Sequence, residues 1–347
     1  MKTTIVDVAR ETGLALSTIS KFLNGGNVRK DNREKIERAI KKLDYVPNGY
    51  AQNLRKARTN TIGCLIDSMQ DEYATQLVMY LTDAAIEKHY QLLYACHNGS
   101  PEAADNAIRL MIESGVDGII LEPVEGADKS LELMRYQEIP FVAIDKKPPV
   151  GACDCVMTNG FLGGYMGCEE LIKFGHRKIA IITADNAKDR SSWNQSRERT
   201  EGFLRALKDY DITIPDNYVE NGNYLFQSGS DCMEKLWAVG DHPTALFIAN
   251  YDMCLGAMLT IHELNIKVPE ELSVVTFDDL LYSCIASPEL TAVKQDTKKM
   301  AYDAVDMIIR RIIKERESGT VIVREMPELI SRDSVRNILL EKETDPK

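Results

Sequence analysis

The sequence contains no stretch of apolar residues long enough to cross a bilayer. None of its 347 residues lies in a run of about 18 consecutive apolar residues, the length that a membrane-spanning helix requires. The amino end, MKTTIVDVARE, also has no apolar core of the kind found in signal peptides. We therefore expect a cytoplasmic protein that does not bind membranes.

The motifs of common enzymes and metal sites are missing as well. There is no P-loop, GxSxG or HExxH motif, the five histidines have no ligand spacing, and the eight cysteines form no CxxC pair. The glycines of GFLGGYMG (160–167) do not form a GxGxxG fingerprint and favour close packing of a helix against a strand. We expect free, mostly buried thiols, no metal, no cofactor, no catalytic residue, and a protein that is not an enzyme.

Charge divides the chain into two parts. Residues 1–60 contain 13 Lys and Arg against 6 Asp and Glu, a net charge of +7. The remaining residues carry 29 basic and 47 acidic side chains, a net charge of −18. A basic head on an acidic body indicates that the head binds a polyanion, although a solvated charged surface gives the same pattern.

The first sixty residues have the pattern of short helices. Thr4 and Asp7 are typical of a capping box that begins a helix, and Gly13 is placed to end it. Further helices are predicted over 16–24, 30–43 and 48–54. Ile19 lies on the apolar stripe of the second of these four helices.

From Thr61 onward, apolar strands alternate with amphipathic helices. This alternation is typical of buried parallel strands joined by βαβ connections. The strands are too many for one open sheet, so we expect two doubly wound parallel sheets in two lobes. A strand over 290–296, a helix over 297–317 and a strand over 320–326 are expected to cross back between the lobes.

Polar side chains follow the carboxyl ends of these strands, where open α/β sheets bind ligands. The clusters are Asp67 to Tyr73, Asp145 to Lys147, Asn159, Arg199, Asn250 to Asp252, and Asp278 with Asp279. Together they indicate a cleft for a small polar molecule, although single strand ends are polar wherever they meet solvent.

Several motifs resemble one family. TIVDVARETGLALSTISKFLN (4–24) resembles the helix-turn-helix of lac repressor (LacI/GalR) family regulators, and YVPNGYAQNLRKARTNTIGCLI (45–66) is similar to that family's hinge helix. DGIIL, GHRKIAII, RTEGF, ANYDMCLGAM, VPEELSVVTFDD and LTAVKQD follow in family order. The resemblance implies an N-terminal all-α helix-turn-helix DNA-binding domain and an α/β two-lobed core similar to periplasmic sugar-binding proteins.

On this basis we predict three segments. A helix-turn-helix domain is expected over 1–46, a hinge helix and linker over 47–60, and an effector-binding core over 61–340. Within the core, the N-lobe is predicted to comprise 61–158 and 292–320, and the C-lobe 159–290 and 321–340.

The resemblance also implies which residues contact DNA. Leu16, Ser17 and Lys21 match the positions that read base edges in the major groove. Thr4 is also a predicted DNA-binding residue, and the residues matched to backbone contacts are Thr18, Ser20, Asn24, Asn32, Asn48, Arg55 and Lys56. Leu54 matches the hinge residue that wedges into the minor groove and kinks the duplex. The GGN loop (25–27) is shorter than in many relatives.

For the effector, the resemblance implies a second set of residues. Arg199 and Asp278 match the family's ligand-binding arginine and aspartate, whereas Tyr251 replaces an aspartate of the family. The predicted effector-binding residues are Tyr73, Lys146, Arg199, Tyr224, Asn250 and Asp278.

The resemblance implies a homodimeric transcription repressor that binds a pseudo-palindromic operator in double-stranded DNA. Its expected effector is a small polar molecule, a sugar or sugar derivative, bound between the lobes. The effector could instead be a purine or nucleoside, and the protein could use a corepressor or act as an activator. A solute-binding protein or an α/β enzyme would share the core, but neither predicts the basic head.

Overall fold

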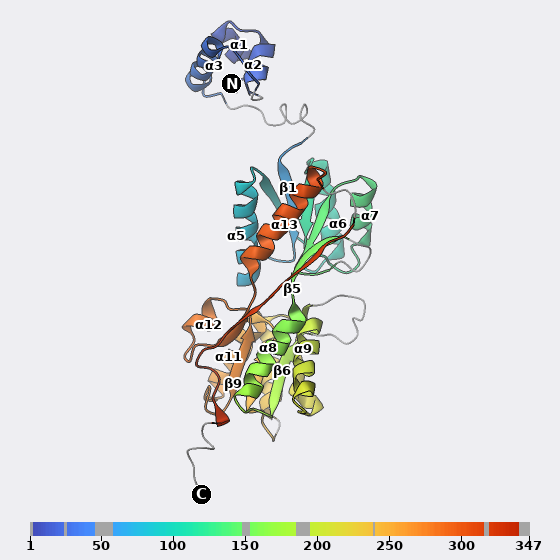
Figure 1. Ribbon diagram of the computed structural model, residues 1–347, viewed down its shortest axis with the longest axis vertical. Helices are drawn as coiled ribbons and strands as arrows, with labels where there is room; N and C mark the ends of the chain where they lie inside the picture. Colours follow the sequence, from blue (N-terminus) through green and yellow to red (C-terminus); the bar gives the residue numbers. More distant parts are fainter. Residues whose placement is uncertain are drawn as a thin grey trace. The chain divides into compact units, whose positions relative to one another are not determined.

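The computed structural model describes residues 3–23, 26–45, 58–147, 153–184, 195–238, 240–315 and 319–339. The chain divides into two compact units, Met1–Thr61 and Ile62–Lys347. The first unit is helical and the second contains two sheets with helices around them, as Figure 1 shows. This division confirms the predicted fold class.

Within residues 3–23 and 26–45, the first unit is a bundle of three short helices. They are α1 (Ile5–Thr12), α2 (Leu16–Leu23) and α3 (Lys30–Lys42). The Asp7 carboxylate accepts hydrogen bonds from the Thr4 amide at 2.9 Å and the Thr4 hydroxyl at 2.7 Å, so α1 begins where the capping box predicted. Gly13 ends α1 with a φ of +67°, a conformation that costs glycine little.

A small apolar core holds these three helices together. Its buried members are Val8, Ile19, Ile36, Ala39 and Tyr45. Ile19 is fully buried, as the apolar stripe of the second helix predicted. The fixed orientation of α2 leaves its other face free for contacts outside the unit.

The second unit contains two six-stranded sheets, which define two lobes. The first lobe has the strand order β11-β5-β4-β3-β1-β2 and the second β12-β10-β9-β8-β6-β7. The first-lobe strands are β1 (Thr61–Ile66), β2 (Gln91–Cys96), β3 (Gly118–Leu121), β4 (Phe141–Ile144), β5 (Asp154–Thr158) and β11 (Ile322–Glu325). Its helices are α5 (Glu72–Glu87), α6 (Pro101–Glu113), α7 (Asp128–Tyr136) and α13 (Thr297–Ile312).

The second lobe repeats this architecture. Its strands are β6 (Ile179–Thr183), β7 (Val219–Asn221), β8 (Ala245–Ile248), β9 (Ser273–Phe277), β10 (Thr291–Lys294) and β12 (Glu328–Ile330). Its helices are α8 (Gly160–Lys173), α9 (Gln195–Asp209), the 3₁₀ helix η1 (Asp216–Tyr218), α10 (Phe226–Ala238), α11 (Tyr251–Glu263) and α12 (Leu281–Ile285). Where registers are given, the pairs are parallel except β10 with β12, which confirms the predicted parallel sheets.

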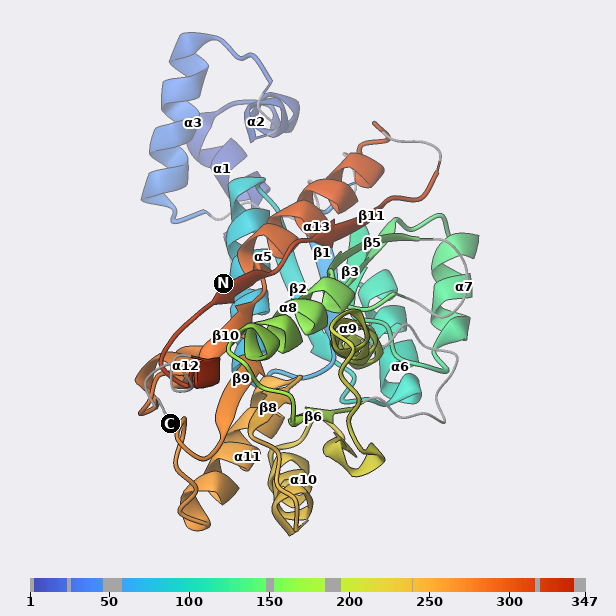
Figure 2. The ribbon, with the colours of Figure 1, turned by 60° about the horizontal axis from the view of Figure 1, so that its bottom comes forward.

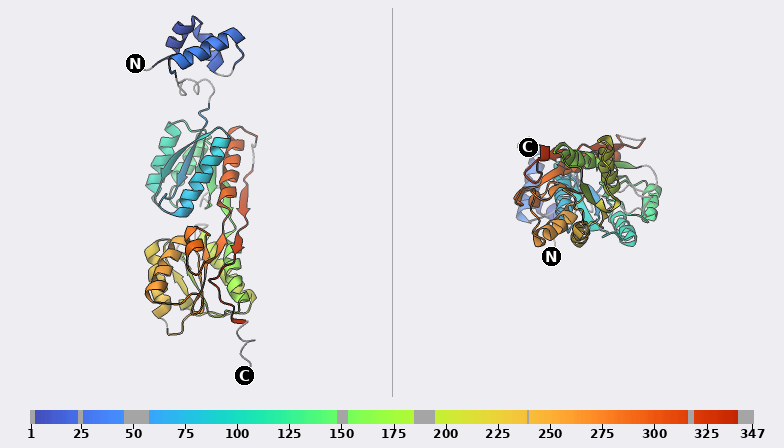
Figure 3. Two further views of the ribbon diagram at one scale, coloured as in Figure 1. Left: turned by 90° about the vertical axis from the view of Figure 1, so that its left-hand side faces the viewer. Right: turned by 90° about the horizontal axis from the view of Figure 1, so that it is seen from below.

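The chain passes between the lobes after β5, after β10 and after β11 (Figures 2 and 3). Two predicted lobe boundaries are corrected by this path. β10 pairs with β9 of the second lobe, so 292–294, predicted for the N-lobe, belong to the second lobe. β11 pairs with β5, so 322–325 belong to the first lobe rather than to the C-lobe. Lateral pairing between strands, which the sequence pattern does not specify, determines both assignments.

Glycines bring α8 against its neighbours. A β-carbon at Gly163 would lie 2.6 Å from the Phe277 ring of β9, and one at Gly167 2.5 Å from the Phe247 ring of β8. These contacts confirm the predicted packing of GFLGGYMG on strands. A β-carbon at Gly164 would overlap the Arg199 carbonyl of α9, so the same glycines also set the spacing between two helices.

The cysteines are free, as predicted. Six are buried, Cys96 is half-buried and Cys284 is exposed. Among the helices of the described ranges, none is long and apolar enough to cross a membrane.

Candidate DNA-binding unit and effector site

The predicted base-reading residues lie on the outer face of α2. Leu16, Ser17 and Lys21 are exposed, whereas Ile19 is buried on the opposite face. Thr4 is exposed, and Thr18, Ser20 and Asn32 are half-buried. The predicted contacts Asn24, Asn48, Leu54, Arg55 and Lys56 lie outside the described residues.

Helix α3 adds positive charge beside α2. The Arg33 guanidinium lies 5.7 Å from the centre of the Phe22 ring, a cation–π contact that joins the two helices. Arg29 precedes α3 as its N-cap and makes no side-chain capping bond. The unit thus presents exposed basic groups on both sides of the turn between α2 and α3.

In the first lobe of the core, acidic groups gather where the strands end. Asp67, Glu122 and Asp145 directly follow β1, β3 and β4. The Tyr73 hydroxyl of α5 donates to Asp145 Oδ1 at 3.0 Å. Burial, together with the charges of Asp145 and Asp278, raises the pKa of the Tyr73 phenol, so the hydroxyl keeps its proton and acts as a donor.

Lys146 lies among these carboxylates. Its Nζ is 3.4 Å from Asp67 Oδ2, and the Asp67 amide donates to Glu122 Oε2 at 2.7 Å. Burial lowers the pKa of Lys146, but the negative charges of Glu122, Asp145 and Asp67 outweigh this effect, so the pKa is raised overall. Tyr224 of the second lobe also raises the pKa of Lys146.

In the second lobe, Arg199 and Asp278 face the same region. Arg199 donates to the Ala249 carbonyl at 2.6 Å, and its guanidinium lies 3.6 Å from the centre of the Phe277 ring. Asp278 Oδ1 accepts from Gln295 Nε2 at 2.6 Å. Burial raises the pKa of Asp278 to about 6, although Arg199 and Gln295 lower it. The charge of Asp145 in the first lobe also raises the pKa of Asp278.

Asn250 has a structural role in this conformation. Its side-chain oxygen accepts from the Met253 amide at 3.1 Å and caps the N-terminus of α11. Tyr224 is half-buried and packs against the core of the second lobe. Of the six predicted effector residues, Tyr73 and Asp278 line one pocket, and Lys146, Arg199, Tyr224 and Asn250 are not among the residues that line it.

The sequence interpretation missed Gln195, which joins the lobes. Its Nε2 donates to the Asp145 carbonyl at 2.7 Å. Gln195 lies four residues before Arg199 on α9, and this spacing, which puts both on one helix face, could have identified it. Among the residues that the structure describes, three buried polar atoms of the two lobes have no protein partner: Gln195 Oε1, Gln295 Oε1 and Arg199 Nε. Buried polar atoms of this kind are suited to accept or donate bonds to a ligand.

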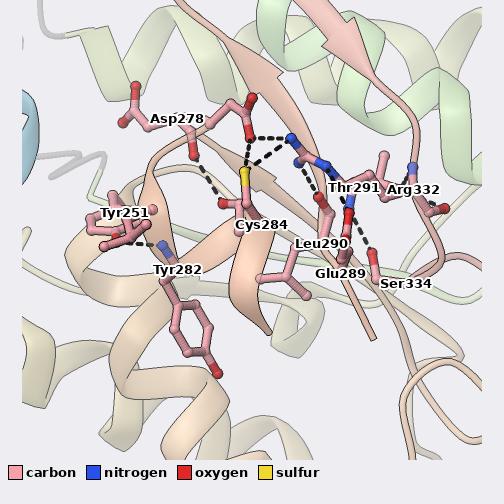
Figure 4. Close-up of polar contacts among 12 residues, drawn as sticks. Tyr251, Asp278, Tyr282, Cys284, Glu289, Leu290, Thr291, Arg332 and Ser334 are labelled. Carbon is pink, nitrogen blue, oxygen red and sulfur yellow. Dashed lines mark hydrogen bonds and ion pairs between the residues drawn. The ribbon is translucent and has the colours of Figure 1, made fainter. Parts of the chain in front are cut away.

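A second connection between the lobes, also missed, involves Tyr251. Its hydroxyl donates to Glu72 of α5 at 2.9 Å and accepts from the Tyr282 amide at 3.2 Å. The Leu281 amide donates to the other Glu72 oxygen at 3.1 Å. We call these three bonds the Glu72–Tyr251 clasp. Figure 4 shows Tyr251 with Tyr282, beside the 2.6 Å bond from Arg332 to the Leu290 carbonyl.

A pocket of about 270 Å³ opens beside Tyr73 and Asp278. It is lined by α5, by the turn after β9 and by the crossing between β10 and α13. The lining residues are Tyr73, Gln76, Tyr80, Asp278, Asp279, Leu280, Lys294, Gln295, Asp296, Thr297 and Lys298. Both lobes thus contribute to a concave, polar space, as ligand sites at strand ends do.

A helix-turn-helix unit joined to a two-lobed core with a polar cleft defines the class of DNA-binding regulators controlled by small molecules. Two family models match the chain. Residues 4–48 match bacterial regulatory proteins of the lacI family, and residues 168–335 match the periplasmic binding protein-like domain.

Curated relatives match over nearly the full length. The HTH-type transcriptional repressor PurR of Haemophilus influenzae is 32% identical over 340 residues, 97% of this chain and 99% of the relative. PurR of Histophilus somni is 29% identical over 96% of this chain and 99% of the relative. The chain belongs to the LacI family of bacterial regulators, and its relatives are transcriptional repressors rather than enzymes.

Solved structures agree with this assignment. The lac repressor dimer bound to operator and the anti-inducer ONPF has a TM-score of 0.85 at 25% identity, covering 97% of this chain and all of that one. The complex of the transcriptional regulator CelR with cellobiose has a TM-score of 0.72 at 25% identity, covering 96% of this chain and all of that one.

Proposed function

We propose that this protein is a homodimeric repressor whose affinity for a pseudo-palindromic operator depends on an uncharged polar effector bound between the two lobes of the core. The observation behind the proposal is that Tyr73 of one lobe and Asp278 of the other line one pocket, while Asp145 binds Tyr73 and accepts a bond from Gln195 of the second lobe. A ligand that contacts both lobes stabilises the closed arrangement of the lobes relative to the open one. This shift can be coupled to the affinity of the DNA-binding unit for its operator.

Charge in the cleft argues for an effector without a phosphate or carboxylate. The acidic side chains of Asp67, Asp71, Glu122, Asp145 and Asp278 lie in this region, against the cations of Lys146 and Arg199 and the two lysines, Lys294 and Lys298, that line the pocket. An added anion would be repelled by these acids, since like charges at short range disfavour each other. Hydroxyl and N–H donors, in contrast, suit carboxylates and the unpartnered oxygens of Gln195 and Gln295.

Two uncharged classes fit this description. The PurR name of relatives that are 32% identical supports a purine base or nucleoside, the alternative that the resemblance left open. The cellobiose complex of CelR, at 25% identity, supports a sugar. Purine N–H groups and sugar hydroxyls can both donate to Asp278, so we place purines first on identity and sugars second.

For the DNA-binding unit, we propose the roles that the family resemblance implies. Lys21, Ser17 and Leu16 read bases, and Thr4, Thr18, Ser20, Asn24 and Asn32 contact phosphates. In the hinge, Leu54 wedges into the minor groove, with Asn48, Arg55 and Lys56 near the backbone. The exposed face of α2 and the net charge of +7 in the first sixty residues support these roles.

Two experiments test the proposal. Selection of sites from random duplex DNA by the purified protein should enrich a pseudo-palindrome at moderate salt, and failure to enrich one would contradict the DNA-binding role. A thermal-shift screen should compare adenine, guanine, hypoxanthine, adenosine, glucose and cellobiose with AMP and glucose 6-phosphate, because a ligand of the native state raises its melting temperature. A shift with the phosphorylated compounds alone would overturn the uncharged-effector assignment.

A further inference from the structure

Gly26 lies directly against the lysine that is proposed to read DNA. Helix α2 ends at Leu23, and the Gly26 amide donates to the Lys21 carbonyl at 2.8 Å. A bond between residues i and i+5 is typical of helix ends at which the chain folds back on the last turn. This turn brings the α-carbon of Gly26 next to the Lys21 side chain.

The requirement for glycine at position 26 is one of space. Gly26 is not among the glycines with positive φ, so its backbone conformation is open to any L-residue. A β-carbon there would lie only 2.6 Å from Cγ of Lys21 and 2.8 Å from its carbonyl oxygen. Favourable contacts between carbon atoms occur at about 3.5–4.0 Å. A side chain at position 26 would therefore displace the Lys21 stem or open the helix end.

The same contact restricts the Lys21 side chain. The position of the absent β-carbon is also 3.4 Å from Lys21 Cε, so the stem follows the surface of Gly26 along its length. The lysine side chain is flexible and carries its charge at one end. A neighbouring surface that excludes some lysine rotamers therefore limits the directions in which the ammonium can point. Within 3–23 and 26–45, Lys21 has no ion pair or hydrogen-bonded side-chain partner, so no described residue of the unit holds its ammonium.

We propose that Gly26 is a positioning residue for sequence recognition and that it directs the Lys21 ammonium toward one base edge. This inference rests on the proposed function, in which α2 lies in the major groove. Direction matters here because lysine lacks the two-pronged fork by which arginine fixes its own geometry on guanine. The short GGN loop then contributes to specificity through its lack of a side chain at position 26.

Site selection with full-length variants tests this role. The wild type defines the operator, and Lys21→Ala identifies the base pair that depends on Lys21. We expect Gly26→Ala to reduce the preference at that same base pair by about fivefold or more, and to leave the preference at other positions unchanged. Asn27→Ala, an exposed neighbour in the same loop, is the matched control and should keep the wild-type preference.

A double variant separates positioning from distortion of the helix end. If Gly26 acts through Lys21, then Gly26→Ala should have no further effect on preference or affinity when Lys21 is already alanine. A different result would overturn the inference: Gly26→Ala lowers DNA affinity in both the wild-type and the Lys21→Ala protein, and the single variant keeps the wild-type base preference. Gly26 would then have only a structural role.

The remaining outcomes are also decisive. A Gly26→Ala variant that keeps the wild-type base preference would overturn the role of Gly26 while leaving the proposed repressor function intact. A wild-type protein that enriches no site would instead contradict the proposed function, and the role of Gly26 with it.

Discussion

Two aspartates in the candidate site have an unusual backbone. Asp145 and Asp278 directly follow β4 and β9, with φ of +65° and +74°. This left-handed conformation is uncommon for residues other than glycine and costs on the order of 1 kcal/mol. Asp145 binds Tyr73 and Asp278 binds Gln295, so each lobe places a carboxylate toward the cleft in the same way. One aspartate in this uncommon conformation at a strand end of each lobe supports a ligand site at these strand ends.

Glu122 should make stability depend on pH. Burial raises its pKa to about 7, whereas glutamate in the unfolded chain ionises near 4.5. The folded state therefore holds a proton that the unfolded state releases, and stability falls as pH rises between these values. We expect Glu122 to contribute a loss on the order of 2 kcal/mol between pH 4.5 and pH 7, which chemical denaturation measures as the difference between the wild type and Glu122→Gln.

Glu122→Gln is the control for this effect. Its amide oxygen can still accept the bond from Asp67, but the side chain does not titrate. The wild-type loss across the window should shrink in the variant, since Asp278 and the other titrating groups are common to both proteins. Parallel stability curves for the two proteins would contradict this assignment.

Asn250 can be assigned to capping or to effector binding by substitution. Its side chain caps α11 in the structure, so Asn250→Ala should lower stability by about 1 kcal/mol without any ligand. Asn250→Ser should restore most of that stability, because serine caps nearly as well. Unchanged stability of the alanine variant would favour a role in effector binding alone.

At the scale of elements, the packing of α8 on α9 depends on glycine. Gly164→Ala would push a methyl group into the Arg199 carbonyl, which is backbone and has no room to move. We expect a loss of about 3 kcal/mol or more in unfolding free energy, among the larger effects of single substitutions. Gly240→Ala, with nothing within 4 Å of the added carbon, is the control and should change stability by less than about 0.5 kcal/mol.

Most elements were predictable from periodicity. The alternation of buried strands and amphipathic helices from Thr61 onward identified nearly all of them, because apolar strands and helical stripes are local features. The exceptions are short. Helix α12 has five residues and β12 three, too few for a period to show. Helix α13 was predicted, but it ends at Ile312 rather than at the predicted boundary of 317.

At the scale of the whole molecule, the Glu72–Tyr251 clasp joins the lobes without a ligand. Tyr251→Phe removes one bond to Glu72 and leaves the Tyr282 amide without its acceptor. A hydrogen bond contributes about 1 kcal/mol, so hydrogen exchange of the Tyr282 amide, which loses its acceptor, should speed up about fivefold. Peptide-level exchange of the full-length protein measures this change.

Tyr302→Phe is the matched control for the clasp. Tyr302 also donates to a glutamate, Glu87, at 2.9 Å, but both residues belong to the first lobe. Its loss should leave exchange near Leu281 unchanged. Equal effects of the two variants would mean that the clasp does not hold the lobes together.

The sequence by itself determined the helix-turn-helix unit, the capping of α1, the alternating core and the family, because caps, periodicity and ordered motifs are properties of neighbouring residues. The tertiary structure alone decided the lobe that β10 and β11 join, the clasp at Tyr251, the contact of Gln195 with Asp145, and the packing of Gly26 under Lys21. Except for Gly26 and Lys21, these features join residues far apart in the chain. The Gly26 contact depends on the path of a turn, which composition does not reveal.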